Sequence, residues 1–149
     1  MIKEKKTKII ICVMLTVFLA WNFIWAMHYF NLKSYTENIP SDGDGGYVTS
    51  DTEENSYSVK VPNYLRFNGN LAVIDENSNS LIIWVSLFDV KTYGVQIYIE
   101  GFETYDMLLD ENGQLLETGN LEDAPEMYNA NKEIIDKLYA YANNFWELK

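Results

Sequence analysis

The hydrophobic and polar positions of this chain follow three patterns in turn. Residues 9–27, IIICVMLTVFLAWNFIWAM, form an uncharged and largely apolar run. From residue 57 onward, apolar residues mostly alternate with polar ones, which is the period of a strand with one buried face. After residue 124 they recur every three or four positions, as in an amphipathic helix. The pattern therefore predicts an apolar helix, then a set of strands, then a second helix.

The apolar run has the length of a membrane-spanning helix. Its 19 residues would extend about 28 Å at about 1.5 Å per residue, close to the roughly 30 Å of hydrocarbon in a bilayer. Lys3, Lys5, Lys6 and Lys8 precede the run, and only Lys33 follows closely. The positive-inside rule then places the N-terminus in the cytoplasm and the rest of the chain outside. We expect a cytoplasmic tail over 1–8 and an anchor over 9–30, embedded through 9–27.

A cleaved signal peptide is the alternative interpretation of the same segment. Signal peptides also begin with a basic region, but their apolar core is about 7 to 15 residues long and ends in a site of A-x-A type. Here the residues three before Ala20 and Ala26 are Phe18 and Ile24, which fit that site poorly. Cys12 lies inside the apolar run rather than after a small residue, so it does not indicate a lipoprotein. A retained anchor is favoured over cleavage.

Residues 31–56 have the composition of a flexible, acidic linker, rich in Gly, Ser, Thr and Asn. Within them, Asp42, Asp44 and Glu53 occupy positions 1, 3 and 12 of the calcium-binding EF-hand spacing. An EF-hand also needs an oxygen ligand at position 5 and Gly at position 6, where this chain has Gly46 and Tyr47. The segment is therefore interpreted as a solvated linker, with weak calcium binding as the alternative and no metal or cofactor site expected.

The strands are predicted from alternation and from two Asn-Gly dipeptides. Residues 57–61 predict a short strand that Pro62 ends. Segments 63–67 and 70–76 flank Asn68-Gly69 and predict one hairpin, because Asn-Gly readily adopts the positive φ values of a tight turn. The apolar run 81–88 predicts a strand at the centre of the sheet, and residues 93–100 a strand with a more polar side. A second hairpin is predicted for segments 103–110 and 114–118, which flank Asn112-Gly113.

The C-terminal segment predicts one helix that packs on the sheet. Its expected apolar stripe, widened by Ile135 and Ala142, is made by Met127, Ile134, Leu138, Tyr141, Phe145 and Leu148. Pro125 suits a first helical turn, and Glu133 with Lys137 forms a favourable pair four residues apart. The predicted fold class is α+β: an N-terminal transmembrane helix, then an antiparallel β-meander of about five to seven strands with this helix packed on it. The extracytoplasmic α+β domain is expected to span 57–149.

Charge divides the chain at the same place as hydropathy. Residues 34–149 hold 21 acidic and 6 basic side chains, a net charge of −15. Such a surface repels nucleic-acid phosphates, so no DNA or RNA partner is expected. It favours cationic partners, although the same charge would also keep an exported domain soluble.

Chemistry-bearing residues are few. The sole Cys and sole His, Cys12 and His28, lie in or beside the apolar run. The outer domain therefore has no internal disulfide, no Cys/His zinc site and no Ser-His-Asp triad. We expect His28 to be a polar tip at the membrane interface rather than a pH sensor.

Paired carboxylates are the remaining catalytic candidates. Glu100 with Glu103, or Asp106 with Asp110, could serve as the acid and base of a glycosidase. In so acidic a chain such pairs arise by chance. The pair Ser58 and Lys60 fits alternate polar residues on a strand better than it fits a nucleophile and its base.

The remaining candidates are aromatic residues: Tyr57, Tyr64, Phe67, Trp84, Tyr93, Tyr98, Phe102 and Tyr105. They either pack between strands and in the core or anchor an interface on the sheet face that one helix leaves uncovered. The sequence thus predicts a non-catalytic, single-pass module on the bacterial cell membrane, with its C-terminal domain extracellular. This module is expected to bind a protein or peptide, and its negative charge favours a cationic partner. The alternative is a small carboxylate-dependent hydrolase of cell-wall glycan.

Overall fold

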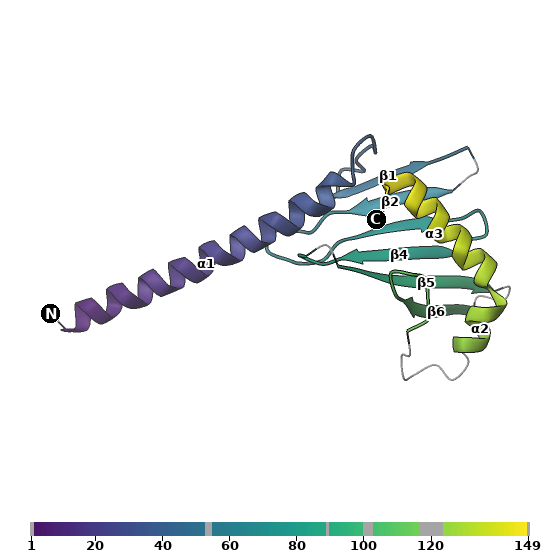
Figure 1. Cartoon of the computed structure of the whole chain (residues 1–149). Helices are drawn as coiled ribbons and strands as arrows, with labels where there is room; N and C mark the ends of the chain where they lie inside the picture. The colour runs from purple at the N-terminus through teal and green to yellow at the C-terminus, as the bar shows by residue number, and fades with distance from the viewer. Residues whose placement is uncertain (1, 53–54, 89, 100–102, 117–123, 149) are drawn as a thin grey trace.

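The protein is a long N-terminal helix joined to a six-stranded sheet that carries two C-terminal helices on one face (Figure 1). The computed structural model describes residues 2–52, 55–88, 90–99, 103–116 and 124–148. In Figure 1, α1 projects from one end of the sheet as a rod, and α3 crosses the sheet diagonally. This arrangement confirms the predicted α+β class and the order of its elements.

The sheet is an antiparallel meander in which the strands lie in sequence order. Each strand pairs with the next, and apart from the 61–69 segment the connections between strands are short, which favours pairing of neighbours in the sequence. The strands are β1 (Gly46–Ser50), β2 (Ser56–Lys60), β3 (Asn70–Ile74), β4 (Ser80–Val85), β5 (Lys91–Ile99) and β6 (Glu103–Leu109).

The core lies between the sheet and α3. Register aligns buried side chains in rows across the strands, because paired residues point to the same face. One row consists of Tyr57, Val73, Leu81, Val95 and Met107, and the next of Val59, Leu71, Ile83, Tyr93 and Leu109.

The single C-terminal helix predicted from the sequence is two helices, α2 (Ala124–Ala130) and α3 (Lys132–Trp146). They meet at Asn131, whose side-chain Nδ2 donates to the Met127 carbonyl oxygen at 2.9 Å. The buried side of α3 also differs from the predicted stripe: it centres on Ile135, Leu138, Ala142 and Trp146, whereas Phe145 is 38% exposed. Compared with the predicted orientation, α3 is therefore rotated about its axis so that Ile135 and Ala142, which were expected at the margin of the stripe, lie at its centre.

One local prediction about strands was wrong, and a second, the hairpin around Asn112-Gly113, was confirmed in part. Residues 63–67 form no strand, and Asn68-Gly69 ends the long 61–69 connection between β2 and β3 rather than forming a two-residue turn. After β6, segment 114–118 contributes an isolated bridge from Leu115 to Leu109. Residues 117–118 lie outside the described part of the chain.

The flexible linker predicted for 31–56 is wrong over the described part of that segment. Helix α1 (Ile2–Ser34) runs into it, Leu32 and Ile39 are buried in the core, and β1 forms the edge of the sheet. β1 has one neighbouring strand, and short strands with small and polar residues are typical at a sheet edge, where they discourage pairing with other chains. The folded domain therefore begins well before residue 57.

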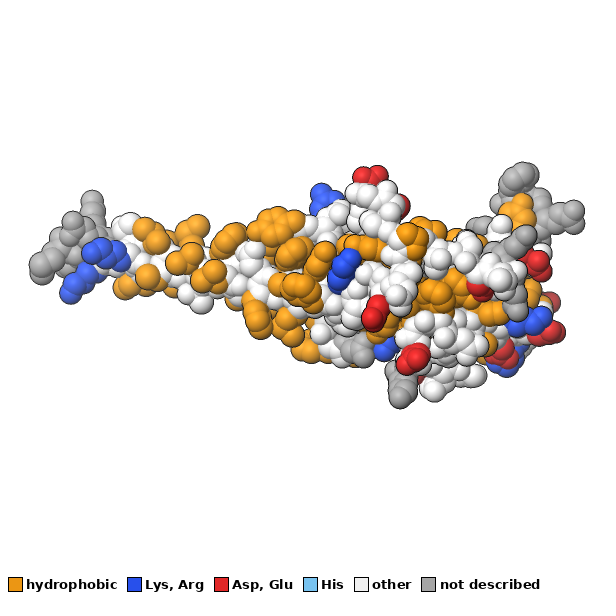
Figure 2. Space-filling model, turned by 90° about the horizontal axis from the view of Figure 1, so that it is seen from above, with side chains coloured by type: hydrophobic (Ala, Val, Ile, Leu, Met, Phe, Trp, Pro, Cys, Tyr) orange, Lys and Arg blue, Asp and Glu red, His pale blue; other side chains and the backbone are white. Residues whose placement is uncertain are grey.

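Helix α1 exposes apolar side chains on all sides for most of its length. Consecutive residues such as Ile9, Ile10 and Ile11 are each more than half exposed, and Figure 2 shows the hydrophobic side chains along the projecting rod. The segment Lys5–Ser34 is the only helix among the described residues that is long and apolar enough to cross a membrane, judged by length and composition. An isolated helix that is apolar all round is typical of a membrane span.

Candidate functional site: the open face of the sheet

The sheet face opposite α3 has no helix over it among the described residues. Alternation along the strands brings apolar and polar side chains together there, in register across the six strands. The apolar members are partly exposed: Val48, Ile74, Trp84, Tyr98 and Leu108 are each 37 to 46% exposed. With one helix predicted to pack on the sheet, one face was expected to remain uncovered, although the residues that form it were not predicted.

A shallow hollow of about 270 Å³ lies on this face over β4, β5 and β6. It forms where Gly94 interrupts the row of side chains between Ile82 and Leu108, its neighbours in register. The Trp84 ring folds across Gly94, so a Cβ added there would lie 2.7 Å from ring atoms Cη2 and Cζ3. Glycine is thus required for the aromatic ring to approach the backbone this closely. The hollow is lined by Ile82, Trp84, Gly94, Val95, Gln96, Asp106, Met107 and Leu108.

The polar edge of the hollow is formed by Gln96 and Asp106, which face each other across β5 and β6. The Asp106 side chain is exposed. The Gln96 side chain also contacts Ser80, whose Oγ lies 3.4 Å from Gln96 Oε1. A carboxylate beside a Trp ring and an aliphatic floor is complementary to a basic side chain with a long apolar stem.

The described part of the acidic segment 41–54 forms a backbone turn at residues 42–46, followed by β1. Asp42 Oδ1 accepts hydrogen bonds from the backbone N–H groups of Asp44 at 2.9 Å and Gly46 at 3.0 Å. Glu53, the third carboxylate of the EF-hand spacing, lies outside the described residues. Across the described part of the chain, no three His, Cys, Asp or Glu side chains gather as metal ligands would.

The same turn recurs around the sheet and gives several aspartates a structural role. In residues 42–46, 75–79 and 110–114, the first residue accepts from the N–H groups two and four positions later and donates its own N–H to the carbonyl four positions later. The fourth residue has positive φ in each case: Gly45, Ser78 and Gly113. This is a type I turn followed by a left-handed residue. The signal in the sequence was the Asp at the first position, more than the Asn-Gly dipeptide.

The candidate carboxylate pairs are not brought together by any contact that the structure shows. Asp106 lies at the hollow, whereas Asp110 Oδ1 holds the backbone of the turn after β6. Glu100 and the Glu103 side chain lie outside the described part. Ser58 and Lys60 are alternate residues of β2, as expected for surface positions on a strand.

His28 is buried rather than exposed as an interfacial tip. It is 4% exposed, and its ring centroid lies 5.9 Å from that of Phe67, in the 61–69 connection that covers it. Neither ring nitrogen has a hydrogen-bond partner among the described residues. Cys12 is exposed on the projecting part of α1.

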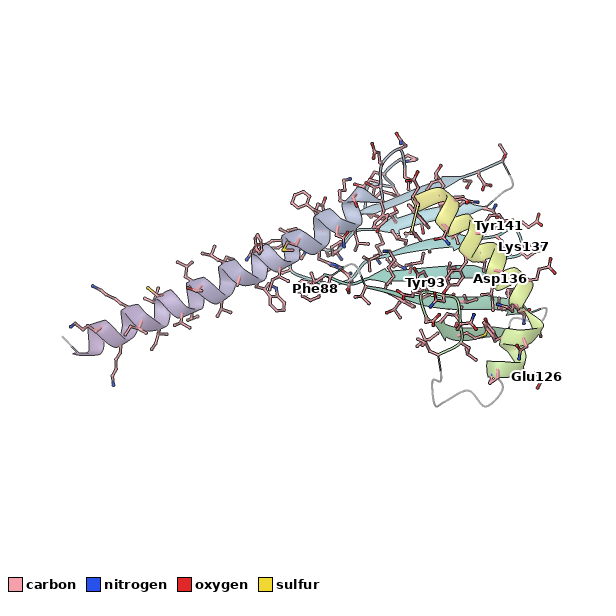
Figure 3. The ribbon with its side chains drawn as sticks, in the orientation of Figure 1. Phe88, Tyr93, Glu126, Asp136, Lys137 and Tyr141 are labelled. Carbon is pink, nitrogen blue, oxygen red and sulfur yellow. The ribbon has the colours of Figure 1, made fainter. Side chains whose placement is uncertain are left out.

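The aromatic residues divide among three environments. Tyr57 and Tyr93 are buried in the core under α3, Trp84 and Tyr98 lie on the open face, and the side chains of Phe102 and Tyr105 are outside the described part. In Figure 3, Tyr93 lies within the sheet region. The third environment holds Tyr64 and Phe67, which pack against α1.

Comparison of the chain with protein families, curated proteins and solved structures found no match to any of them.

Proposed function

We propose that this protein is a membrane-anchored, extracytoplasmic, non-catalytic module that binds a cationic protein or peptide segment on the open face of its sheet, as part of a bacterial envelope assembly. The single observation that carries this proposal is the hollow beside Trp84, with its apolar floor and the Asp106 carboxylate at its edge. Partly exposed aromatic and aliphatic side chains at the centre of a concave patch are typical anchors of protein interfaces.

The net charge of the outer chain supports the sign of the partner. Residues 34–149 carry −15, and an acidic surface speeds the encounter with basic segments and disfavours acidic ones. On the open face, Asp106 and Lys60 are the charged side chains among the described strand residues, and Lys60 lies four strands away from Asp106. A basic side chain could therefore approach the hollow without a nearby like charge on the described strands.

The anchor is placed in the cell membrane with the N-terminus cytoplasmic, because basic residues precede the apolar run. Retention is supported by contacts within the protein. Trp21, Asn22 and Trp25 contact the 61–69 connection. Cleavage after Ala26 would remove all three, and with them the surface on which that connection packs.

A peptide-binding measurement on the full-length protein tests the proposal. The protein is embedded in nanodiscs of zwitterionic lipid, so that a cationic probe does not bind the bilayer, and titrated with a fluorescent peptide of alternating lysine and valine. We expect this peptide to bind and its glutamate–valine counterpart not to bind. Asp106→Asn should weaken binding several-fold, because it removes a charge but hardly changes the shape of the side chain.

The matched control is Asp136→Asn, on the outer side of α3, where Asp136 forms an exposed pair with Lys132 at 3.2 Å. This change removes the same charge from the molecule without touching the open face, so it should leave affinity nearly unchanged. Equal binding of the two peptides, or equal effects of the two variants, would show that the open face does not bind cationic segments.

A further inference from the structure

The end of the sheet that meets α1 carries two strand-to-strand connections, together with the 42–46 turn before β1 and the 110–114 turn after β6. In an antiparallel meander, alternate connections lie at the same end, so the 61–69 connection (β2 to β3) and the 86–90 connection (β4 to β5) are neighbours. Figure 3 shows Phe88, in the second connection, at the end of the sheet from which α1 projects. We call the two together the anchor-side loops.

The first of the anchor-side loops packs on α1 through specific contacts. Phe67 meets the Trp21 ring edge to face, with centroids 5.0 Å apart, and Tyr64 meets Trp25 in the same way at 5.1 Å. Trp25 Nε1 donates to the Asn63 carbonyl oxygen at 2.9 Å. The Tyr64 hydroxyl donates to Asn22 Oδ1, also at 2.9 Å. This loop therefore lies beside the last turns of the apolar run 9–27.

The anchor-side loops expose apolar side chains that the domain does not bury. Phe88 is 87% exposed, the highest fraction among the described large hydrophobic residues, and Val90 and Tyr64 are 63% and 62% exposed. The second loop is held in shape by Ser86, whose Oγ accepts from the backbone N–H groups of Phe88 at 3.3 Å and Val90 at 3.1 Å. These two hydrogen bonds hold the backbone of Phe88 and of Val90 to Ser86, while the Phe88 side chain faces the surroundings.

The depth of α1 in a bilayer identifies what these side chains meet. A helix needs about 20 residues to cross roughly 30 Å of hydrocarbon. If Lys8 marks the inner boundary, the outer boundary falls near His28. That level is beside Trp25 and the loop that contacts it. Aromatic side chains are favoured at this depth, and Arg66 is the only charged residue in the sequence of the first loop.

We propose that the anchor-side loops insert into the outer interface of the bilayer that α1 crosses, with Phe88, Val90, Tyr64 and Phe67 as anchors. The domain is then held against the lipid surface in one orientation instead of swinging on a tether. The inference rests on the membrane-spanning part of the proposed function and is independent of peptide binding on the open face.

A depth measurement with single-cysteine labels tests this inference. In a Cys12→Ser background, Phe88→Cys carries an environment-sensitive fluorophore, and the full-length protein is placed in zwitterionic bilayers that contain spin-labelled lipid. We expect blue-shifted emission, strong quenching by the lipid and weak quenching by aqueous iodide. The matched control is Asn77→Cys, in the exposed 75–79 turn at the opposite end of the sheet, where iodide should quench several-fold more than lipid.

A label on native Cys12, within the apolar run, reports separately on α1. If Cys12 is quenched by lipid while the label at position 88 responds to iodide as the label at 77 does, the loops do not insert, although the anchor stands. If the Cys12 label is itself in water, α1 does not span the bilayer, and both the inference and the anchor are refuted. Because Phe88 is almost fully exposed, its replacement does not threaten folding.

Discussion

Tyr139 shows how one side chain connects α3 to the sheet and to the turn after β6. Its hydroxyl donates to the Asp110 carbonyl oxygen at 3.0 Å, and its ring lies 5.0 Å from that of Tyr93. The ring also packs on Gly113, whose φ of +74° admits few other residues. Burial, and secondarily the neighbouring Tyr93, raises the pKa of the Tyr139 hydroxyl above its usual range. The neutral hydroxyl is therefore the form that the fold accommodates.

This raised pKa predicts a loss of stability at alkaline pH that depends on Tyr139. The unfolded state ionises this hydroxyl at about pH 10, before the folded state does. The contribution of Tyr139 is thus fully present below about pH 10 and declines as pH rises above it. Tyr139→Phe should cost about 0.5–1.5 kcal/mol at neutral pH through its lost hydrogen bond and should flatten the decline between pH 10 and 11. Thermal unfolding of the full-length protein in detergent measures both effects.

Tyr98→Phe, on the open face, is the control, since Tyr98 is 41% exposed and its removal should not flatten the alkaline decline. Equal slopes for the wild type and Tyr139→Phe would contradict the prediction.

Helix α3 shows how a patterned segment becomes part of the core. The helical spacing of its apolar residues predicts an apolar side. Packing on β3 and β4 then determines which of those side chains are fully buried. At its C-terminal end, Phe145 stacks on Tyr57 with ring centroids 4.0 Å apart, which ties the helix to β2. The exposed side carries the pairs Lys132–Asp136 and Lys137–Glu133, at 3.2 and 3.1 Å. Such surface pairs stabilise a helix only slightly, so apolar burial holds α3 in place.

Leu138 and Asn144 measure that burial. Leu138 is fully buried, whereas Asn144, six residues later on the same helix, is exposed. Leu138→Ala should lower the free energy of unfolding by about 2–5 kcal/mol, whereas Asn144→Ala should change it by less than about 0.5 kcal/mol. Denaturant unfolding of the full-length protein, followed by near-ultraviolet circular dichroism, compares the two. If both changes are negligible, α3 is not docked in solution, and its apolar side is free to bind another chain.

Within the molecule as a whole, α1 belongs to two parts. Its N-terminal portion is an apolar rod, and its last turns lie in the acidic domain. At about 1.5 Å per residue, the 33 residues of α1 extend about 50 Å, well beyond the hydrocarbon thickness. The last turns of α1 therefore serve as part of the domain: Leu32 is fully buried, and Lys33 donates to the Tyr47 hydroxyl. Because the apolar part of α1 and the domain share a continuous helix, the orientation of one constrains that of the other.

This continuity predicts how the protein responds to protease. If α1 spans the cell membrane with the C-terminal domain outside, proteinase K added to intact protoplasts should remove the domain and leave α1 protected in the membrane. Permeabilised protoplasts, probed with an antibody to an N-terminal tag, supply the control, because the tag should become accessible only there. A mature form that begins after Ala20 or Ala26, found by N-terminal sequencing, would show that the segment is a signal peptide.

Features set by neighbouring residues could be predicted from the sequence. The apolar run has no charge over the length of a bilayer, the strands alternate with period two, and the final segment has helical spacing. Each of these patterns reflects a local requirement for burying one side of an element. Short connections then allowed the order of the strands to be predicted as well.

Features set by contacts between distant residues could not be predicted. The burial of His28 depends on the 61–69 connection, about 40 residues later, and the hollow at Trp84 depends on the register that brings Gly94 and Leu108 alongside it. The composition of residues 31–56 resembled a linker because an edge strand needs few apolar side chains, and only pairing with β2 makes β1 a strand. Nearest-neighbour patterns hold no information about such pairings, because their stability comes from partners supplied elsewhere in the chain.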